Sequence, residues 1–168
     1  MNKNNIAAQL YTLRDFLKTR EDIDKTFRKV KEIGYNAVQL SGLGPVDPYF
    51  LQELSKELDL KLCATHISYD RLKNDIKTVI KEHKLWECEF VGIGSMPGEF
   101  ARDKSGYTKF AKEASLIAKE LSDNGLKLIY HNHNFEFEKF DGLTGLDILI
   151  YLIGEYQPDP IWILPGKH

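Results

Sequence analysis

The sequence lacks several features that would set it apart from ordinary soluble proteins. It has two cysteines, Cys63 and Cys88, and they are not spaced like the close pairs of zinc knuckles or redox motifs. We therefore expect two free, buried thiols, which favours a reducing cytoplasm. No apolar run approaches the roughly 18 residues of a membrane span, and residues 1–5 lack the pattern of an export signal. These absences predict a cytoplasmic protein without a membrane partner.

An excess of charge of one sign is also missing. The chain has 23 basic and 25 acidic side chains, for a formal net charge of −2. Such a balance provides no field that would attract nucleic acid, so we expect no nucleic-acid partner. At 168 residues, one domain with a substantial hydrophobic core is the default expectation.

Five short apolar segments predict strands, and each is followed by a stretch with helical spacing of its apolar residues. The strands are expected at residues 6–10, 37–40, 61–67, 90–93 and 127–132. The repeat of about 30 residues is that of a β/α unit, in which successive strands run parallel.

Cap residues mark the expected helix ends. Gly34 is a typical residue after a helix, and Asp47 followed by Pro48 is a typical start. Thr144 and Asp147 have the spacing of a capping box. In the third unit, a single helix is expected to carry Leu72, Ile76, Val79, Ile80 and His83 on one side.

Two architectures contain such units: a doubly wound open sheet and an eight-stranded barrel. An open sheet gathers its polar residues at one switch point, whereas a barrel collects one or two from nearly every strand end. Here polar side chains follow every expected strand: Gln9, Arg14, Gln39, Ser41, His66, Ser68, Ser95, His131, Asn132 and His133. We therefore predict an α/β protein that is a partial (β/α)8 TIM barrel, with about five to five and a half β/α units and parallel strands.

The densest polar cluster follows the fifth strand. His131 and His133 are two residues apart, so on a strand they share a face, and Glu136 could fold back over the strand end to share a cation with them. Strict alternation would place Glu136 on the opposite face, so this arrangement requires the chain to bend near Asn134. The alternative is that the histidines only form hydrogen bonds in the barrel mouth and that Glu136 is solvated.

Polar residues at other strand ends are candidates for contacts with a ligand. His66 ends the third strand, and Gln9 and Gln39 occupy comparable places on the first and second. A lone polar residue at a strand end is often only part of a local hydrogen-bond network. Because so many converge here, we expect these three residues to bind substrate.

Four segments together resemble the xylose-isomerase-like barrel superfamily, and more narrowly the bacterial sugar phosphate isomerases/epimerases. They are Gln9-Leu-Tyr-Thr-Leu-Arg14, Gly34-Tyr-Asn-Ala-Val-Gln39, Thr65-His66 and Tyr130-His-Asn-His-Asn-Phe-Glu-Phe137. The resemblance covers about residues 5–155 and is most specific at the fifth strand. It implies a small-molecule partner, a sugar or sugar phosphate.

The resemblance further implies a divalent metal ion (Mn, Mg, Co or Zn) held by four residues at successive strand ends. Glu136 would be one ligand, and Asp159, which precedes Trp162 in a D-x-x-W pattern, would be another. Proton transfer next to a carbonyl, through an enediolate, would then involve Glu136 and His133 as catalytic residues. Gln9, Gln39, His66 and His131 would bind the sugar.

The expected barrel part covers residues 1–157, and 158–168 read as an atypical tail, a truncated or frameshifted sixth strand. An open barrel edge also suggests a homodimer or a complementing C-terminal fragment as partner. Two other functions stay open: a metal-dependent polyol-ketone dehydratase of the same superfamily, and a non-catalytic truncated module. The endonuclease branch ranks lower, because a DNA-binding surface should be basic.

Overall fold

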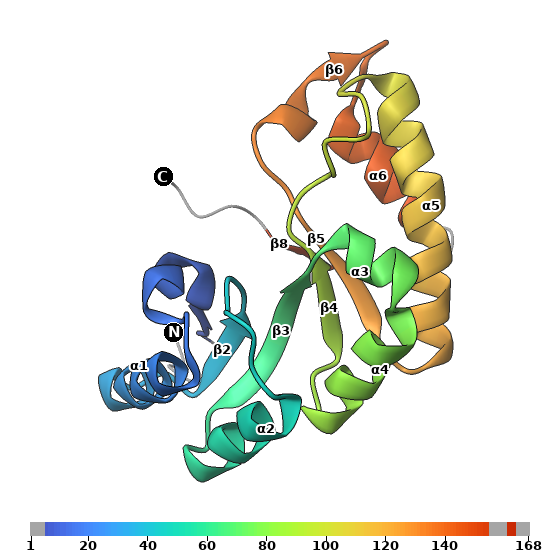
Figure 1. The fold of residues 1–168 in the computed structure, drawn as a ribbon. Coiled ribbons are helices and arrows are strands. Elements are labelled where there is room, and N and C mark those ends of the chain that lie inside the picture. Colours follow the sequence, from blue (N-terminus) through green and yellow to red (C-terminus); the bar gives the residue numbers. More distant parts are fainter. Residues whose placement is uncertain (1–5, 155–160, 164–168) are drawn as a thin grey trace. The chain divides into compact units, whose positions relative to one another are not determined.

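The computed structural model describes residues 6–154 and 161–163, which belong to two compact units. Unit 1 takes residues up to 66 together with 81–90, and unit 2 takes 67–80 together with those from 91 onward. Along the chain, five strands of parallel sheet alternate with helices, and a further short strand follows (Figure 1). The predicted α/β class is therefore confirmed.

Unit 1 is built on three parallel strands in the order β1 (Ala8–Gln9), β2 (Ala37–Leu40) and β3 (Lys61–Ile67). The last residue of β3, Ile67, already belongs to unit 2. A 3-10 helix, η2 (Leu10–Phe16), follows β1, and helices α1 (Arg20–Ile33) and α2 (Pro48–Glu57) connect the strands. The buried faces of these elements form one apolar cluster, which includes Leu10, Phe27, Val38 and Leu62.

The predicted helix ends occur where the cap residues indicated. The Asp47 carboxylate accepts a hydrogen bond from the Tyr49 backbone N–H at 3.0 Å, which begins α2. Gly34 ends α1 with a φ of 110°, a conformation that favours glycine. Before α6 (Gly145–Gly154), the Asp147 carboxylate accepts from the Thr144 N–H and the Thr144 hydroxyl accepts from the Asp147 N–H, which confirms the capping box.

Unit 2 contains β4 (Phe90–Ile93), β5 (Lys127–His131) and β8 (Ile161–Ile163), with β8 parallel to β5. The first residue of β4, Phe90, belongs to unit 1. Helix α5 (Lys104–Asp123) packs beside α6 (Figure 1). A small antiparallel pair, β6 (Lys139–Phe140) and β7 (Leu143–Thr144), leads into α6. The core of the unit is rich in aromatic side chains, among them Tyr107, Phe110 and Tyr130.

The expected single helix of the third unit is wrong. The structure has two helices, α3 (Tyr69–Asn74) and α4 (Ile76–Leu85), separated by Asp75. The Asp75 N–H closes α3 by donating to the Arg71 carbonyl, and the Asp75 carbonyl accepts from Val79 to open α4. The apolar stripe continues across this break, so its spacing could not reveal it.

The two cysteines are free, as expected, although Cys63 is only half-buried. Burial raises the pKa of the Cys88 thiol to about 12. None of the helices in the described part of the chain is long and apolar enough to cross a membrane.

Candidate functional site

The segment after β5 turns Glu136 inward. The strand ends at His131, and a short 3-10 helix, η3 (Phe135–Phe137), follows Asn134, whose backbone is right-handed helical. This bend near Asn134 is the one that the folded-back position of Glu136 requires. The Glu136 side chain has no exposed surface, so the alternative of a solvated carboxylate is wrong.

Both Glu136 carboxylate oxygens already accept hydrogen bonds. The Tyr130 hydroxyl donates to Oε1 at 2.6 Å, and the His133 backbone N–H donates to Oε2 at 2.7 Å. The Met96 N–H in turn donates to the Tyr130 hydroxyl oxygen at 2.8 Å. Burial, and then the hydrogen bond to Glu136, raise the pKa of Tyr130 far above its usual range, so the hydroxyl stays a donor. Glu136 thus ties the end of β5 to the loop after β4.

The two histidine rings lie beside this network. Their centroids are 4.9 Å apart in an edge-on arrangement, and the His133 ring stacks on Phe135 at 5.5 Å with an interplanar angle of 8°. His133 Nδ1 lies 4.0 Å from Glu136 Oε1 and has no hydrogen-bond partner among the described residues. The His133 side chain is 38% exposed. Of this cluster, His133 therefore offers a ligand an accessible ring, whereas Glu136 does not.

Unit 1 gathers the other predicted residues at its own strand ends. Gln9 and Gln39 are register partners on β1 and β2. The Ser41 hydroxyl and His66 Nδ1 are hydrogen-bonded at 3.2 Å. Gln39 is 6% exposed, and its Nε2 has no hydrogen-bond partner in the described part of the chain. A buried amide without a partner carries a desolvation cost, which a bound hydroxyl or water would relieve.

The described residues do not form a complete site for a divalent metal ion. Among them, no group of three or more histidine, cysteine, aspartate or glutamate side chains could hold one. The Glu136 carboxylate is fully buried and engaged on both oxygens. The predicted ligand Asp159 lies outside the described residues.

Sequence reasoning missed three residues of this cluster. Tyr130 precedes the two histidines and could have been suspected as a buried phenol that needs a partner. Phe135 is adjacent to Glu136, but nothing in the pattern shows that it stacks on His133. Arg102, whose guanidinium carbon lies 3.9 Å from the centroid of the Phe135 ring, is more than thirty positions away and had no signal.

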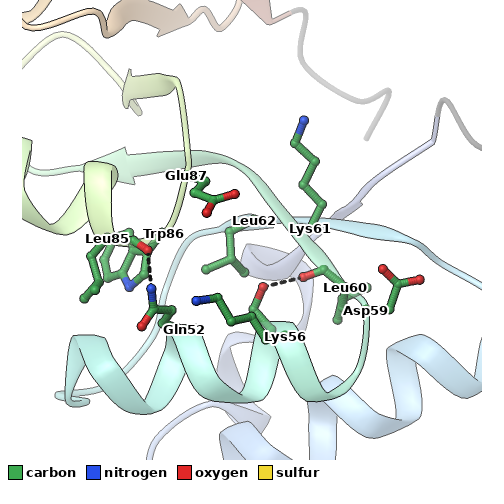
Figure 2. Close-up of a pocket in the computed structure, with 10 residues that line it drawn as sticks. Gln52, Lys56, Asp59, Leu60, Lys61, Leu62, Leu85, Trp86 and Glu87 are labelled. Atoms are coloured by element: carbon green, nitrogen blue, oxygen red, sulfur yellow. Dashed lines mark hydrogen bonds between the residues drawn. The ribbon is translucent and has the colours of Figure 1, made fainter.

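Unit 1 contains a pocket of about 490 Å³ (Figure 2). Its lining includes Trp86 and the first two residues of β3, Lys61 and Leu62. This is the amino end of the strand, whereas His66 is near its carboxyl end. In barrels of parallel strands, ligand chemistry belongs to the carboxyl ends, so we assign this pocket to the face that contributes stability.

No protein-family model and no curated protein matches the sequence. Solved structures do match. A sugar phosphate isomerase/epimerase from Parabacteroides distasonis ATCC 8503 has a TM-score of 0.73 at 14% identity, over 98% of this chain and 66% of that one. An L-ribulose 3-epimerase has a TM-score of 0.66 at 14% identity, over 95% and 59%. A xylose isomerase domain protein from Salmonella typhimurium LT2 has a TM-score of 0.63 at 11% identity, over 98% and 60%.

These likenesses show the fold. The chain matches xylose isomerase-like TIM barrel proteins and spans about three fifths to two thirds of their length, which is a partial barrel, as predicted. Proteins with this fold differ in activity, since the matches also include an AP endonuclease from Brucella melitensis and a probable 3-DHS dehydratase from Bacillus anthracis. The activity of this chain must therefore be argued from its own site.

Proposed function

We propose that the chain forms part of a sugar or sugar phosphate isomerase or epimerase that moves a proton on the carbon next to a carbonyl. The observation that carries this proposal is the cluster at the end of β5, where an accessible imidazole, His133, is held over a buried carboxylate. The fold supports it, because the carboxyl ends of barrel strands carry the catalytic groups.

His133 and Glu136 have different roles in this proposal. His133 exchanges a proton with the substrate carbon, because an imidazole can accept and return a proton near neutral pH. The proton leaves the carbon as an enediolate forms. In an isomerase it returns to the neighbouring carbon, whereas in an epimerase a proton from solvent is added to the opposite face of the same carbon. Glu136 is a positioning residue, because it holds the His133 backbone through the 2.7 Å hydrogen bond.

Sugar binding beside His133 is assigned to His131 of unit 2. Gln9, Gln39 and His66, at the strand ends of unit 1, are assigned separately as residues that bind a sugar hydroxyl. The support is strongest for Gln39, whose buried amide has a free donor among the described residues. The metal ion that the resemblance implies, with Glu136 and Asp159 as ligands, supplies no step in this mechanism, since the described residues do not complete a site for it.

Solvent exchange tests the proposal directly. The 168-residue protein is incubated in D2O with a panel of ketoses and ketose phosphates, with and without added divalent metal ions, and deuterium at the carbons beside the carbonyl is followed by NMR. We expect exchange with at least one substrate, reduced about 100-fold or more by His133→Gln. Glu138→Gln, a change at an exposed residue in the same segment, is the control and should leave exchange unchanged.

Other outcomes would redirect the assignment. No exchange with any sugar would contradict the proposal and favour a non-catalytic module, which saturable sugar binding would then identify. Loss of water from a polyol ketone, seen as a new absorbance, would favour the dehydratase reading, for which the structural match to the 3-DHS dehydratase is the specific support.

A further inference from the structure

Arg102 stands beside the His133 cluster with its hydrogen-bonding groups unused. The residue is exposed, and its guanidinium carbon lies 3.9 Å from the centroid of the Phe135 ring. The same phenyl ring stacks on His133. Within the described part of the chain, Arg102 forms no hydrogen bond or ion pair, so all five of its N–H donors remain available.

The neighbouring carboxylates are engaged with other groups. Asp103, the next residue, caps α5 by accepting from the Gly106 N–H at 2.8 Å and from the Ser105 hydroxyl at 2.7 Å. Glu136 accepts from Tyr130 and from the His133 backbone. Arg102 is therefore a fixed positive charge that these two carboxylates do not bind.

The Phe135 ring supports the guanidinium without using its donors. A cation over an aromatic face is held through the plane of the guanidinium, which leaves the N–H edge free for a planar or tetrahedral anion. Arginine binds phosphate in this two-pronged way more strongly than it binds a neutral hydroxyl. The arrangement thus suits an anion held beside Phe135, the residue whose ring also stacks on His133.

We propose that Arg102 binds the phosphate of the substrate, so that the sugar which reaches His133 is phosphorylated. This inference rests on the proposed function, which leaves open whether the sugar carries a phosphate. The group that Arg102 would recognise is a phosphate dianion, which a sugar phosphomonoester and inorganic phosphate both carry and a free sugar lacks.

Titrations with three probes test this assignment: inorganic phosphate, a ketose phosphate and the same ketose without phosphate. Binding is followed by NMR at the Arg102 side-chain N–H and the His133 ring. The test variant is Arg102→Gln. The matched control is Arg20→Gln, since Arg20 also stacks on a phenyl ring, that of Phe50 at 4.2 Å, but belongs to unit 1.

Both phosphorylated probes are expected to bind the wild-type protein, with the ketose phosphate tighter than inorganic phosphate. Arg102→Gln should weaken both by about tenfold or more, while Arg20→Gln leaves them unchanged. Arg102→Lys should recover only part of the affinity, because lysine keeps the positive charge but cannot form the two parallel hydrogen bonds of a guanidinium. Equal binding by wild type and Arg102→Gln, or equal losses in both glutamine variants, would overturn the inference.

The same probes separate this inference from the proposed function. If the ketose phosphate binds through Arg102 but exchanges no deuterium, the phosphate site stands and the proton-transfer function fails. If the phosphorylated and unphosphorylated ketoses exchange equally fast, in wild type and in Arg102→Gln alike, the function stands and the phosphate site is refuted.

Discussion

Replacement of Glu136 by glutamine should destabilise the protein strongly, although the two side chains have nearly the same size and shape. The buried carboxylate accepts from the Tyr130 hydroxyl and the His133 N–H. A glutamine retains one oxygen and turns an amide N–H2 group toward a second donor. Hydrogen bonds to a charged group contribute about 1.5–3 kcal/mol each, and a buried donor left unpaired costs about 1–3 kcal/mol, so we expect a loss of about 2–4 kcal/mol.

Urea unfolding followed by circular dichroism measures this loss, and amide hydrogen exchange at His133 shows whether it is local. Glu138→Gln is the matched control, because that side chain is exposed and should change stability by no more than about 0.5 kcal/mol. Tyr130→Phe breaks the same network at its other end, and the double variant should lose less than the sum of the two single losses.

A different result would refute the reasoning. If Glu136→Gln stays within about 0.5 kcal/mol of wild type and the His133 amide keeps its protection, the carboxylate does not hold the end of β5. Glu136 would then have to be reconsidered as a group that acts on a ligand.

Two further predictions concern the same unit. Gly145→Ala should destabilise the protein by about 1–3 kcal/mol in urea unfolding, because a Cβ there would overlap the buried ring of Tyr107, whereas Gly154→Ala, with open space around it, should not. Asp147→Asn should lower stability near neutral pH, since the hydrogen bonds from Thr144 hold the pKa of Asp147 below its ordinary value of 3.8. That contribution is complete above pH 3.8 and is lost as the pH falls through the lower pKa of the folded state, so thermal unfolding of variant and wild type should converge in acid.

Single residues in the sequence predicted the helix ends correctly where the conformation or hydrogen bond of that residue alone sets the end of the helix. Gly34 ended a helix because its backbone adopts a positive φ, and Asp47 began one because its carboxylate caps a free N–H. The strand ends were predicted within two residues, and the largest difference is at β1, which begins at Ala8 rather than at residue 6. The break at Asp75 was missed because both helices bury the same stripe.

The candidate site was harder to predict, because its contacts join distant segments. The spacing of His131, His133 and Glu136 indicated that these residues act together, and the structure places them together. It could not show that the Glu136 carboxylate is already occupied by Tyr130 and a backbone N–H. Which hydrogen-bond donors reach the Glu136 carboxylate depends on the three-dimensional path of the chain. The spacing of residues in the sequence gives no information about that path.

The two compact units are interleaved along the chain, since residues 67–80 belong to unit 2 while residues 81–90 return to unit 1. Helix α4 crosses this boundary within its own length. On the ribosome, unit 1 therefore cannot be completed until residue 90 has emerged, although its first 66 residues come earlier. No single cut in the gene would separate the units cleanly, because a fragment that contains all of one unit also carries a segment of the other.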